Sequence, residues 1–351
     1  MLIGKHLCLL SAALLTGVVA APAQQAPPAS DPIPRSIHLN IAVTTKSGAP
    51  VADLTQQDFT LMDNGAAEPI TSFKAVTVGQ EPVEVILLLD AANAPFSTMA
   101  WERQQVQNFL KANGGKMAHP TTIAVLTDKG AQIQNGFSVD GNVLNDVFER
   151  YTSGLREINR GSGFWGATER LEISLKALHD LAAFTAKLPG RKVILWISPG
   201  WPLLSGDRTQ INDKEQSQIF GQIVSFSGQL RLANTTLYDV DPRGAGAAVL
   251  HADYYREFLK GIRKPDQTVL GNLGLQVLAL QSGGKVVESN NAVAEMLNQC
   301  LSDVDSWYEI NFHMAPAEKP NEYHHVEVKV DKSGLIARTR DGYYAQPEAR
   351  P

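Results

Sequence analysis

The chain has 351 residues, of which 44% are hydrophobic and 19% charged, so it can bury the core of one large domain together with a smaller unit. Its formal net charge is -5 and its lysines and arginines are scattered, which argues against nucleic acid as the main partner.

The first 23 residues predict a signal peptide. One lysine precedes an apolar run from Leu7 to Val19, and the small-residue sequence Ala21-Pro22-Ala23 follows as a cleavage site. Cleavage there predicts an exported protein, periplasmic or secreted, with no membrane span in the mature chain. A retained anchor is the alternative, but the apolar run is short for a span. Removal of Cys8 would leave Cys300 alone, in an amphipathic stretch that favours a buried thiol over a nucleophile.

Residues 24–36 are rich in Ala, Pro and Gln, and we expect them to form a flexible tether. Residues 37–78 predict a small β unit. Thr55-Gln56-Gln57-Asp58 is a capping-box pattern suited to one short helical turn, and Asp63-Asn64-Gly65 is a hairpin-turn signal between two strands. A unit of this size is too small to hold a good core by itself.

Residues 79–304 alternate between strand and helix patterns, which implies a mostly parallel sheet covered by helices on both sides. We expect strands at 83–89, 121–126, 132–137, 192–197, 235–240 and 285–287. We expect helices at 97–111, 140–150, 213–232, 270–281 and 292–302, and another between the Gly-rich loop at 161–166 and Pro189.

From residue 305 the apolar period returns to two. SWYEINFHM, HHVEVKV and LIARTR predict three strands in residues 305–345, with Asp331-Lys332-Ser333-Gly334 turning the last pair, before a tail at 346–351. This segment resembles residues 37–78 in length and turn chemistry. Because domain termini are often close together, we predict that the two pack as one sandwich-like β unit.

Asp90 stands at the point around which the α/β part is organised. The strand VEVILLL has no polar alternation and therefore predicts burial on both faces. It ends in Asp90, at the carboxyl end of a parallel strand, where open α/β sheets place their ligands. This position makes Asp90 the first candidate for a functional residue.

Several segments together resemble the von Willebrand factor A-related domain proteins of the acidobacterial type. They are VEVILLLDAANAPFS, TTIAVLTDKG, GATERLEISLKAL, PGRKVILWISPGWPLL and LANTTLYDVDPRG, with LTQQDFTLMDNG and ARTRDGYYA as flanks. The resemblance covers nearly all of the mature chain. It implies a doubly wound, mostly parallel sheet with one antiparallel edge strand. It also implies adhesion or protein association and no enzyme activity.

The same resemblance implies a divalent cation site built from Asp-x-Ser-x-Ser, a Thr and a further Asp. Here Asp90 is followed by Ala92 and Ala94, and the last position holds Ser198. Mg²⁺ needs near-octahedral oxygen ligands, so the missing oxygens indicate a degenerate site that holds no metal. Asp90 is then interpreted as a turn former that accepts N–H bonds from residues 91–97.

A rebuilt cation site is the alternative, using Asp90, with Asn93 for one replacement oxygen and Thr168 for the threonine. Nothing in the sequence makes a convincing catalyst: ISPGW lacks a nucleophile elbow, and no histidine pair has metal-ligand spacing. We therefore expect no cofactor and no enzyme activity. A hydrolase of unrecognised geometry is the remaining alternative.

Apolar loops at the carboxyl ends of the strands predict a patch that binds a protein or cell-envelope partner. The alternative is that their rings pack on one another and close the top of the sheet. The candidate residues are Phe96, Phe164, Trp165, Trp201, Leu203, Asp241 and Arg243. The sequence thus favours an exported, non-enzymatic interaction or adhesion module.

Overall fold

The computed structural model describes residues 36–77, 79–155, 163–204, 211–244, 254–288 and 291–347. The predicted signal peptide, the tether up to residue 35 and residues 348–351 lie outside this range. Residues 35–351 form one compact unit. No helix in the described ranges has the length and apolar character needed to span a membrane.

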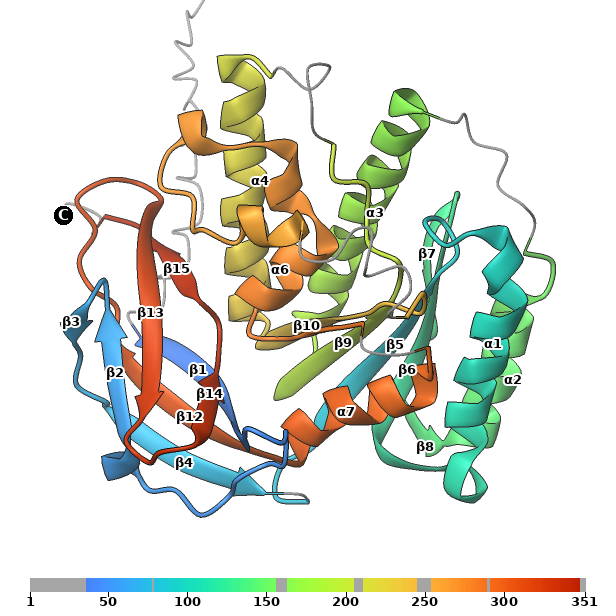
Figure 1. Cartoon of the computed structure of the whole chain (residues 1–351), viewed down its shortest axis with the longest axis horizontal. Coiled ribbons are helices and arrows are strands. Elements are labelled where there is room, and N and C mark those ends of the chain that lie inside the picture. Colours follow the sequence, from blue (N-terminus) through green and yellow to red (C-terminus); the bar gives the residue numbers. More distant parts are fainter. Residues whose placement is uncertain are drawn as a thin grey trace, which may run out of the picture. The chain divides into compact units, whose positions relative to one another are not determined.

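A seven-stranded sheet lies at the centre of the α/β part (Figure 1). Its order is β11-β10-β9-β5-β6-β7, and β8 also pairs with β6. The pairs β10–β11, β9–β10, β5–β9 and β5–β6 are parallel, whereas β7 and β8 run antiparallel to β6, which confirms the expected mostly parallel sheet with an antiparallel edge. The strands are β5 Val83–Asp90, β6 Lys116–Thr127, β7 Gly130–Ile133, β8 Ser138–Asp140, β9 Arg191–Ile197, β10 Thr235–Val240 and β11 Val286–Val287.

Helices cover both faces of this sheet. Along β5, Val85, Leu87 and Leu89 pack in one buried cluster with α1, α2 and α7. Ile86 and Leu88 pack in a second cluster with α3, α4 and α6, so β5 is buried on both faces as its sequence predicts. The helices are α1 Phe96–Lys111, α2 Gly141–Thr152, α3 Phe164–Thr185, α4 Asp213–Leu232, α6 Leu275–Gln281 and α7 Val293–Asp305. Cys300 of α7 is fully buried, as expected.

Two expected elements differ in the structure. The strand expected at 132–137 begins earlier and is shorter, as β7, and a second short strand, β8, follows it. The helix expected at 270–281 is divided at Gly274, which has an extended backbone between the 3-10 turn η6 Leu270–Leu273 and α6. A Cβ atom at Gly274 would lie 2.2 Å from Cδ2 of Leu203, so the loop after β9 occupies the space that a side chain would need.

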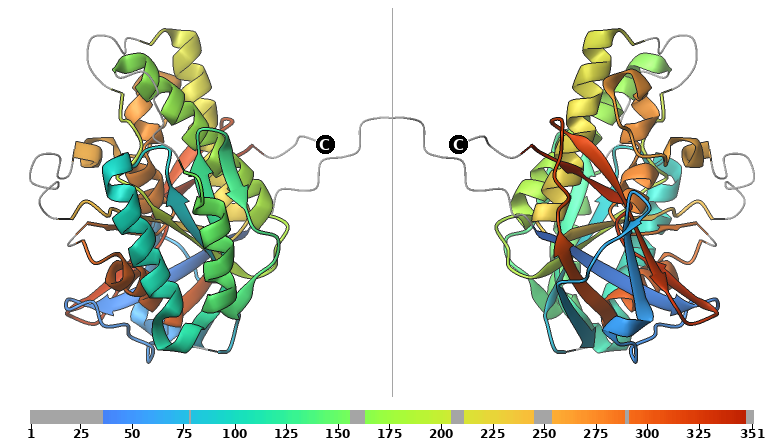
Figure 2. Two further views of the ribbon diagram at one scale, coloured as in Figure 1. Left: turned by 90° about the vertical axis from the view of Figure 1, so that its right-hand side faces the viewer. Right: turned by 90° about the vertical axis from the view of Figure 1, so that its left-hand side faces the viewer.

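Strands from the two ends of the chain pair with each other in two four-stranded sheets, β14-β1-β12-β4 and β15-β13-β2-β3 (Figure 2, right). Leu39 of β1 lies opposite Ile310 of β12, and Leu61 of β2 lies opposite Val328 of β13. Apolar residues of both sheets share one buried cluster. The strands are β1 Ser36–Thr45, β2 Phe59–Asp63, β3 Ala66–Ala67, β4 Ser72–Thr77, β12 Ser306–His313, β13 Glu322–Val330, β14 Leu335–Arg338 and β15 Gly342–Ala345.

The local turn predictions for this region had mixed outcomes. The short turn predicted by the capping box is the 3-10 helix η1 Gln56–Asp58, and Asn64 and Gly65 take the positive φ angles of a tight hairpin turn. The turn at 331–334, however, does not join a hairpin: β14 pairs with β1 in the other sheet. The sequence also did not predict β15, which pairs with β13.

Asp303 of α7 ties the two regions together. Its carboxylate accepts from Lys285 Nζ at 2.7 Å and from Tyr238 Oη at 3.1 Å, and it forms an ion pair with Arg338 of β14. The Asp303 side chain is fully buried. Its two cations compensate the charge that burial would otherwise disfavour.

Candidate functional site

The strand order reverses between β5 and β9. From β5 the chain moves outward through β6 and β7, and from β9 it moves the other way through β10 and β11. Loops diverge at such a reversal and leave a crevice at the carboxyl ends of the strands, where open α/β sheets bind ligands. Asp90 ends β5 at this point and Ser198 follows β9.

The Asp90 carboxylate is bound entirely by donors of the protein itself. Its Oδ1 accepts from the backbone N–H groups of Ala92 at 3.1 Å and Asn93 at 3.0 Å. Its Oδ2 accepts from Asn93 Nδ2 at 2.9 Å, Trp196 Nε1 at 3.0 Å and Ser198 Oγ at 3.0 Å. Five donors occupy the roughly four lone-pair sites of a carboxylate, which agrees with the interpretation of Asp90 as a turn former.

Of the alternative cation set, Asp90 and Asn93 lie together, because Asn93 Nδ2 donates to the Asp90 carboxylate. The Thr168 hydroxyl donates to the carbonyl of Phe164 at 3.0 Å, inside its own helix. The α3 residue that reaches the loop is Ser174, whose Oγ accepts from Asn93 Nδ2 at 2.9 Å. Asn93 Oδ1 is buried with no hydrogen-bond partner in the described part of the chain, but one amide oxygen does not supply the near-octahedral set that Mg²⁺ requires. Within the described ranges, no three His, Cys, Asp or Glu side chains are placed to hold a metal.

Three further carboxylates, those of Glu102, Asp239 and Asp241, lie near this edge, and sequence reasoning missed the first two. Glu102 of α1 is 1% exposed; burial, with the charges of Asp90 and Asp241, raises its pKa to about 7 despite a 2.6 Å bond from Thr98 Oγ1. Asp239 of β10 is fully buried, neither of its carboxylate oxygens has a hydrogen-bond partner among the described residues, and burial raises its pKa well above the ordinary value. Burial also raises the pKa of Asp90. The signals were an acid in the apolar stripe of α1 and one within the strand TTLYDV.

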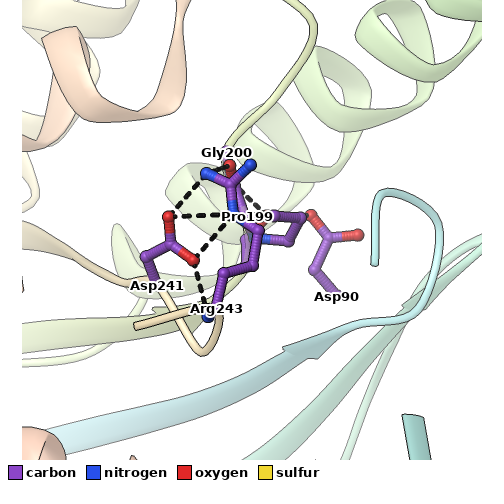
Figure 3. Close-up of polar contacts among 6 residues, drawn as sticks. Asp90, Pro199, Gly200, Asp241 and Arg243 are labelled. Atoms are coloured by element: carbon purple, nitrogen blue, oxygen red, sulfur yellow. Dashed lines mark hydrogen bonds and ion pairs between the residues drawn. The ribbon is translucent and has the colours of Figure 1, made fainter. Parts of the chain in front are cut away.

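Arg243 links the loops that follow β9 and β10 (Figure 3). Its Nε and Nη2 donate to both oxygens of Asp241 at 2.6–3.1 Å, and Nη2 also donates to the carbonyl of Pro199 at 2.7 Å. Asp241 is 4% exposed. The prediction that Asp241 belongs to a partner-binding surface is therefore wrong, because its carboxylate is used inside the protein to neutralise Arg243.

Trp201 also does not lie on the surface. It is 1% exposed, and its ring meets Trp196 edge-on, with centroids 5.0 Å apart and an interplanar angle of 70°. Leu203 is half-buried against Gly274. The alternative in which rings close the top of the sheet holds for Trp201, because the neighbouring Trp196 is itself anchored on Asp90.

Three aromatic side chains remain accessible at the starts of α1 and α3. Trp165 is 81% exposed, the largest value among the large hydrophobic side chains of the described residues, and Phe96 is 50% exposed. Phe164 is half-buried, and its ring lies 5.7 Å from that of Trp165 at 80°. Among the described residues, the ring contact within the predicted patch joins Trp165 to Phe164, and no ring contact joins Phe96 to this pair.

No family model and no curated protein matches the sequence. Among solved structures, the chain is similar to the manganese-loaded TRAP protein of Plasmodium vivax, at 10% identity and a TM-score of 0.34, over 78% of this chain and 98% of that one. It is also similar to the N-terminal domain of TFIIH p34, at 11% identity and a TM-score of 0.31, over 62% and 96%. Values of this size establish neither a shared family nor a shared function.

Proposed function

We propose that this protein is an exported, non-enzymatic protein-binding module whose contact surface is centred on Trp165 and does not depend on a divalent cation. The observation that carries the proposal is the 81% exposure of Trp165. Moving an exposed tryptophan side chain from water into a protein interface is favourable. Tryptophan is also enriched among the residues that dominate binding energy.

The setting of Trp165 favours recognition over chance exposure. It stands in the first turn of α3, directly after Phe164, and Phe164 packs against the buried cluster on that face of the sheet. The edge-on contact with Phe164 limits the orientations of the indole. A side chain restrained in this way loses little conformational entropy on binding.

Independence from cations follows from the contacts of Asp90. An incoming Mg²⁺ would have to displace donors from Trp196, Ser198 and the 92–93 backbone, each of which would lose its hydrogen bond to the carboxylate. Each such loss costs about 1–3 kcal/mol. We therefore propose a degenerate metal site in which protein donors replace the ion. Export is supported by the N-terminal apolar run and its small-residue site alone.

The test is affinity capture from a cell-envelope extract with the mature protein, followed by binding measurements on the captured partner. Loss of one hot-spot tryptophan costs about 2 kcal/mol or more, so Trp165→Ala should weaken binding about 30-fold. Ile336→Ala is the matched control, because it removes an exposed apolar side chain (52%) from β14. Wild type and control should retain the partner in the presence of EDTA. Retention by Trp165→Ala, or release by EDTA, would refute the proposal.

A further inference from the structure

A cavity of about 430 Å³ opens where the segment after the 3-10 turn η4 Tyr254–Phe258 faces β13. Its walls also include the end of α6 and the residue before β15. The cavity is lined by Leu259, Lys260, Gly261, Arg263, Leu280, Gln281, Tyr323, His325 and Asp341. None of these residues belongs to the edge that carries Asp90 or to the surface around Trp165. The size lies within the range of small-molecule sites.

The shape of the cavity is set by Tyr323 and its neighbours. Tyr323 is 8% exposed, and its hydroxyl donates to the carbonyl of Asp341 at 3.3 Å. Its ring lies 5.2 Å from that of Tyr344, whose hydroxyl donates to the carbonyl of Ile262 at 3.0 Å. A Cβ atom at Gly261 would lie 2.2 Å from the Tyr323 ring. These contacts within the protein fix the position of the apolar wall.

Three basic side chains, Lys260, Arg263 and His325, are exposed at this cavity. Within the described residues, none of the three side chains has a hydrogen bond or an ion pair with a protein group. The cavity therefore gathers three basic side chains, although the chain as a whole has a formal net charge of -5. Because they have no acidic partner among the residues that the structure describes, an anionic group entering the cavity can pair with them without displacing a described contact.

We propose that this cavity binds a small organic anion, with its charged head between Lys260 and Arg263 and its apolar body against Leu259, Leu280 and Tyr323. The apolar walls supply burial for the body and the unpaired cations supply orientation. This site is independent of the proposed protein-binding surface.

Asp341 gives the site a pH dependence. Burial raises its pKa to about 7, against the opposing charge of Arg340, and Tyr323 lies beside it. The other titratable groups around it are Tyr344 and the three basic side chains of the cavity. A neutral Asp341 tolerates a bound anion, whereas an ionised Asp341 repels it. Affinity should therefore fall as the pH rises through about 7.

The probe is 8-anilino-1-naphthalenesulfonate, an aromatic anion whose fluorescence rises on burial. Its matched neutral partner is N-phenyl-1-naphthylamine, which has the same rings without the sulfonate. In the double variant Lys260→Ala/Arg263→Ala, we expect affinity for the sulfonate to fall at least tenfold and affinity for the neutral compound to stay unchanged. Lys176→Ala is the control, since Lys176 lines another concave site between α3 and α4. It should leave both affinities unchanged.

Three outcomes would overturn the proposal: no sulfonate binding by wild type, equal sulfonate affinity in the double variant, or an equal loss for both compounds, which would implicate the walls alone. The pH arm compares wild type with Asp341→Asn and with His325→Gln. Sulfonate affinity should fall between pH 6 and pH 8 in wild type and in His325→Gln, and should change little over that range when Asp341→Asn is combined with His325→Gln. A fall of the same size in Asp341→Asn would refute the assigned role of that carboxyl.

Discussion

Burial of Glu102 predicts that the protein loses stability as the pH rises, and Glu102→Gln isolates this effect. The pKa of Glu102 is raised from 4.5 to about 7 in the folded state. The folded protein therefore holds this proton over a pH range in which the unfolded chain has released it. The sign follows: the unfolding free energy falls between about pH 4.5 and pH 7 and is level above that range. A pKa difference of about 2.5 corresponds to about 3 kcal/mol.

Glutamine keeps the shape of Glu102 and cannot ionise. The difference in unfolding free energy between Glu102→Gln and wild type should therefore shift by about 3 kcal/mol in favour of the variant between pH 4 and pH 8. Urea unfolding at a series of pH values measures it. Exposed Glu172→Gln reports the effect of removing one surface charge. A difference that stays constant within about 1 kcal/mol would show that Glu102 is not held protonated.

Three further predictions concern Asp90, Asp303 and the N-terminus. Asp90→Asn turns an amide N–H₂ toward buried donors and should lower the free energy of unfolding, measured with urea, by about 3 kcal/mol. Millimolar Mg²⁺ should not change the urea midpoint of either protein. A Mg²⁺-dependent rise in the wild-type midpoint would contradict the contacts described. Asp303→Asn leaves Lys285 and Arg338 without their buried counter-charge and should cost about 3 kcal/mol, so a loss below about 1 kcal/mol would show that the network is dispensable. Edman sequencing of the protein from its native host should begin at Gln24, and Met1 at the N-terminus would argue for a retained leader.

Sequence patterns predicted the strands of the central sheet because each strand is indicated by residues within the strand itself. The apolar runs at 83–89 and 192–197 have the length and composition of doubly buried strands, and β5 and β9 are there. Asp140 caps α2 by accepting from Asn142 N–H, as an acid before a helical pattern predicts. Two predictions failed because of contacts between residues distant in sequence. The helix expected at 270–281 is divided because Leu203 fills the space beside Gly274, and the expected last hairpin does not form because β14 pairs with β1 and not with β13.

The candidate site also combines features that the local sequence predicts with contacts between residues distant in sequence. Asp90, Ala92, Ala94 and Ser198 are enough to indicate from the sequence that the oxygen set of a cation site is incomplete. They do not show which groups of the protein bind the Asp90 carboxylate. Trp196 of β9 and Ser198, which directly follows β9, donate to Asp90 of β5. The two segments are more than 100 residues apart in sequence and come together only because β5 and β9 pair in the sheet.

The sequence by itself thus determined most of the strand and helix order, the position of Asp90 at a sheet edge and the presence of Ala92, Ala94 and Ser198 beside it, because these depend on residue type and spacing along the chain. Tertiary structure alone decided that Trp201 and Asp241 are buried while Trp165 is exposed, and that burial raises the pKa values of Glu102 and Asp239. Exposure and pKa depend on which atoms surround a side chain, and those atoms come from segments that only the folded sheet brings together.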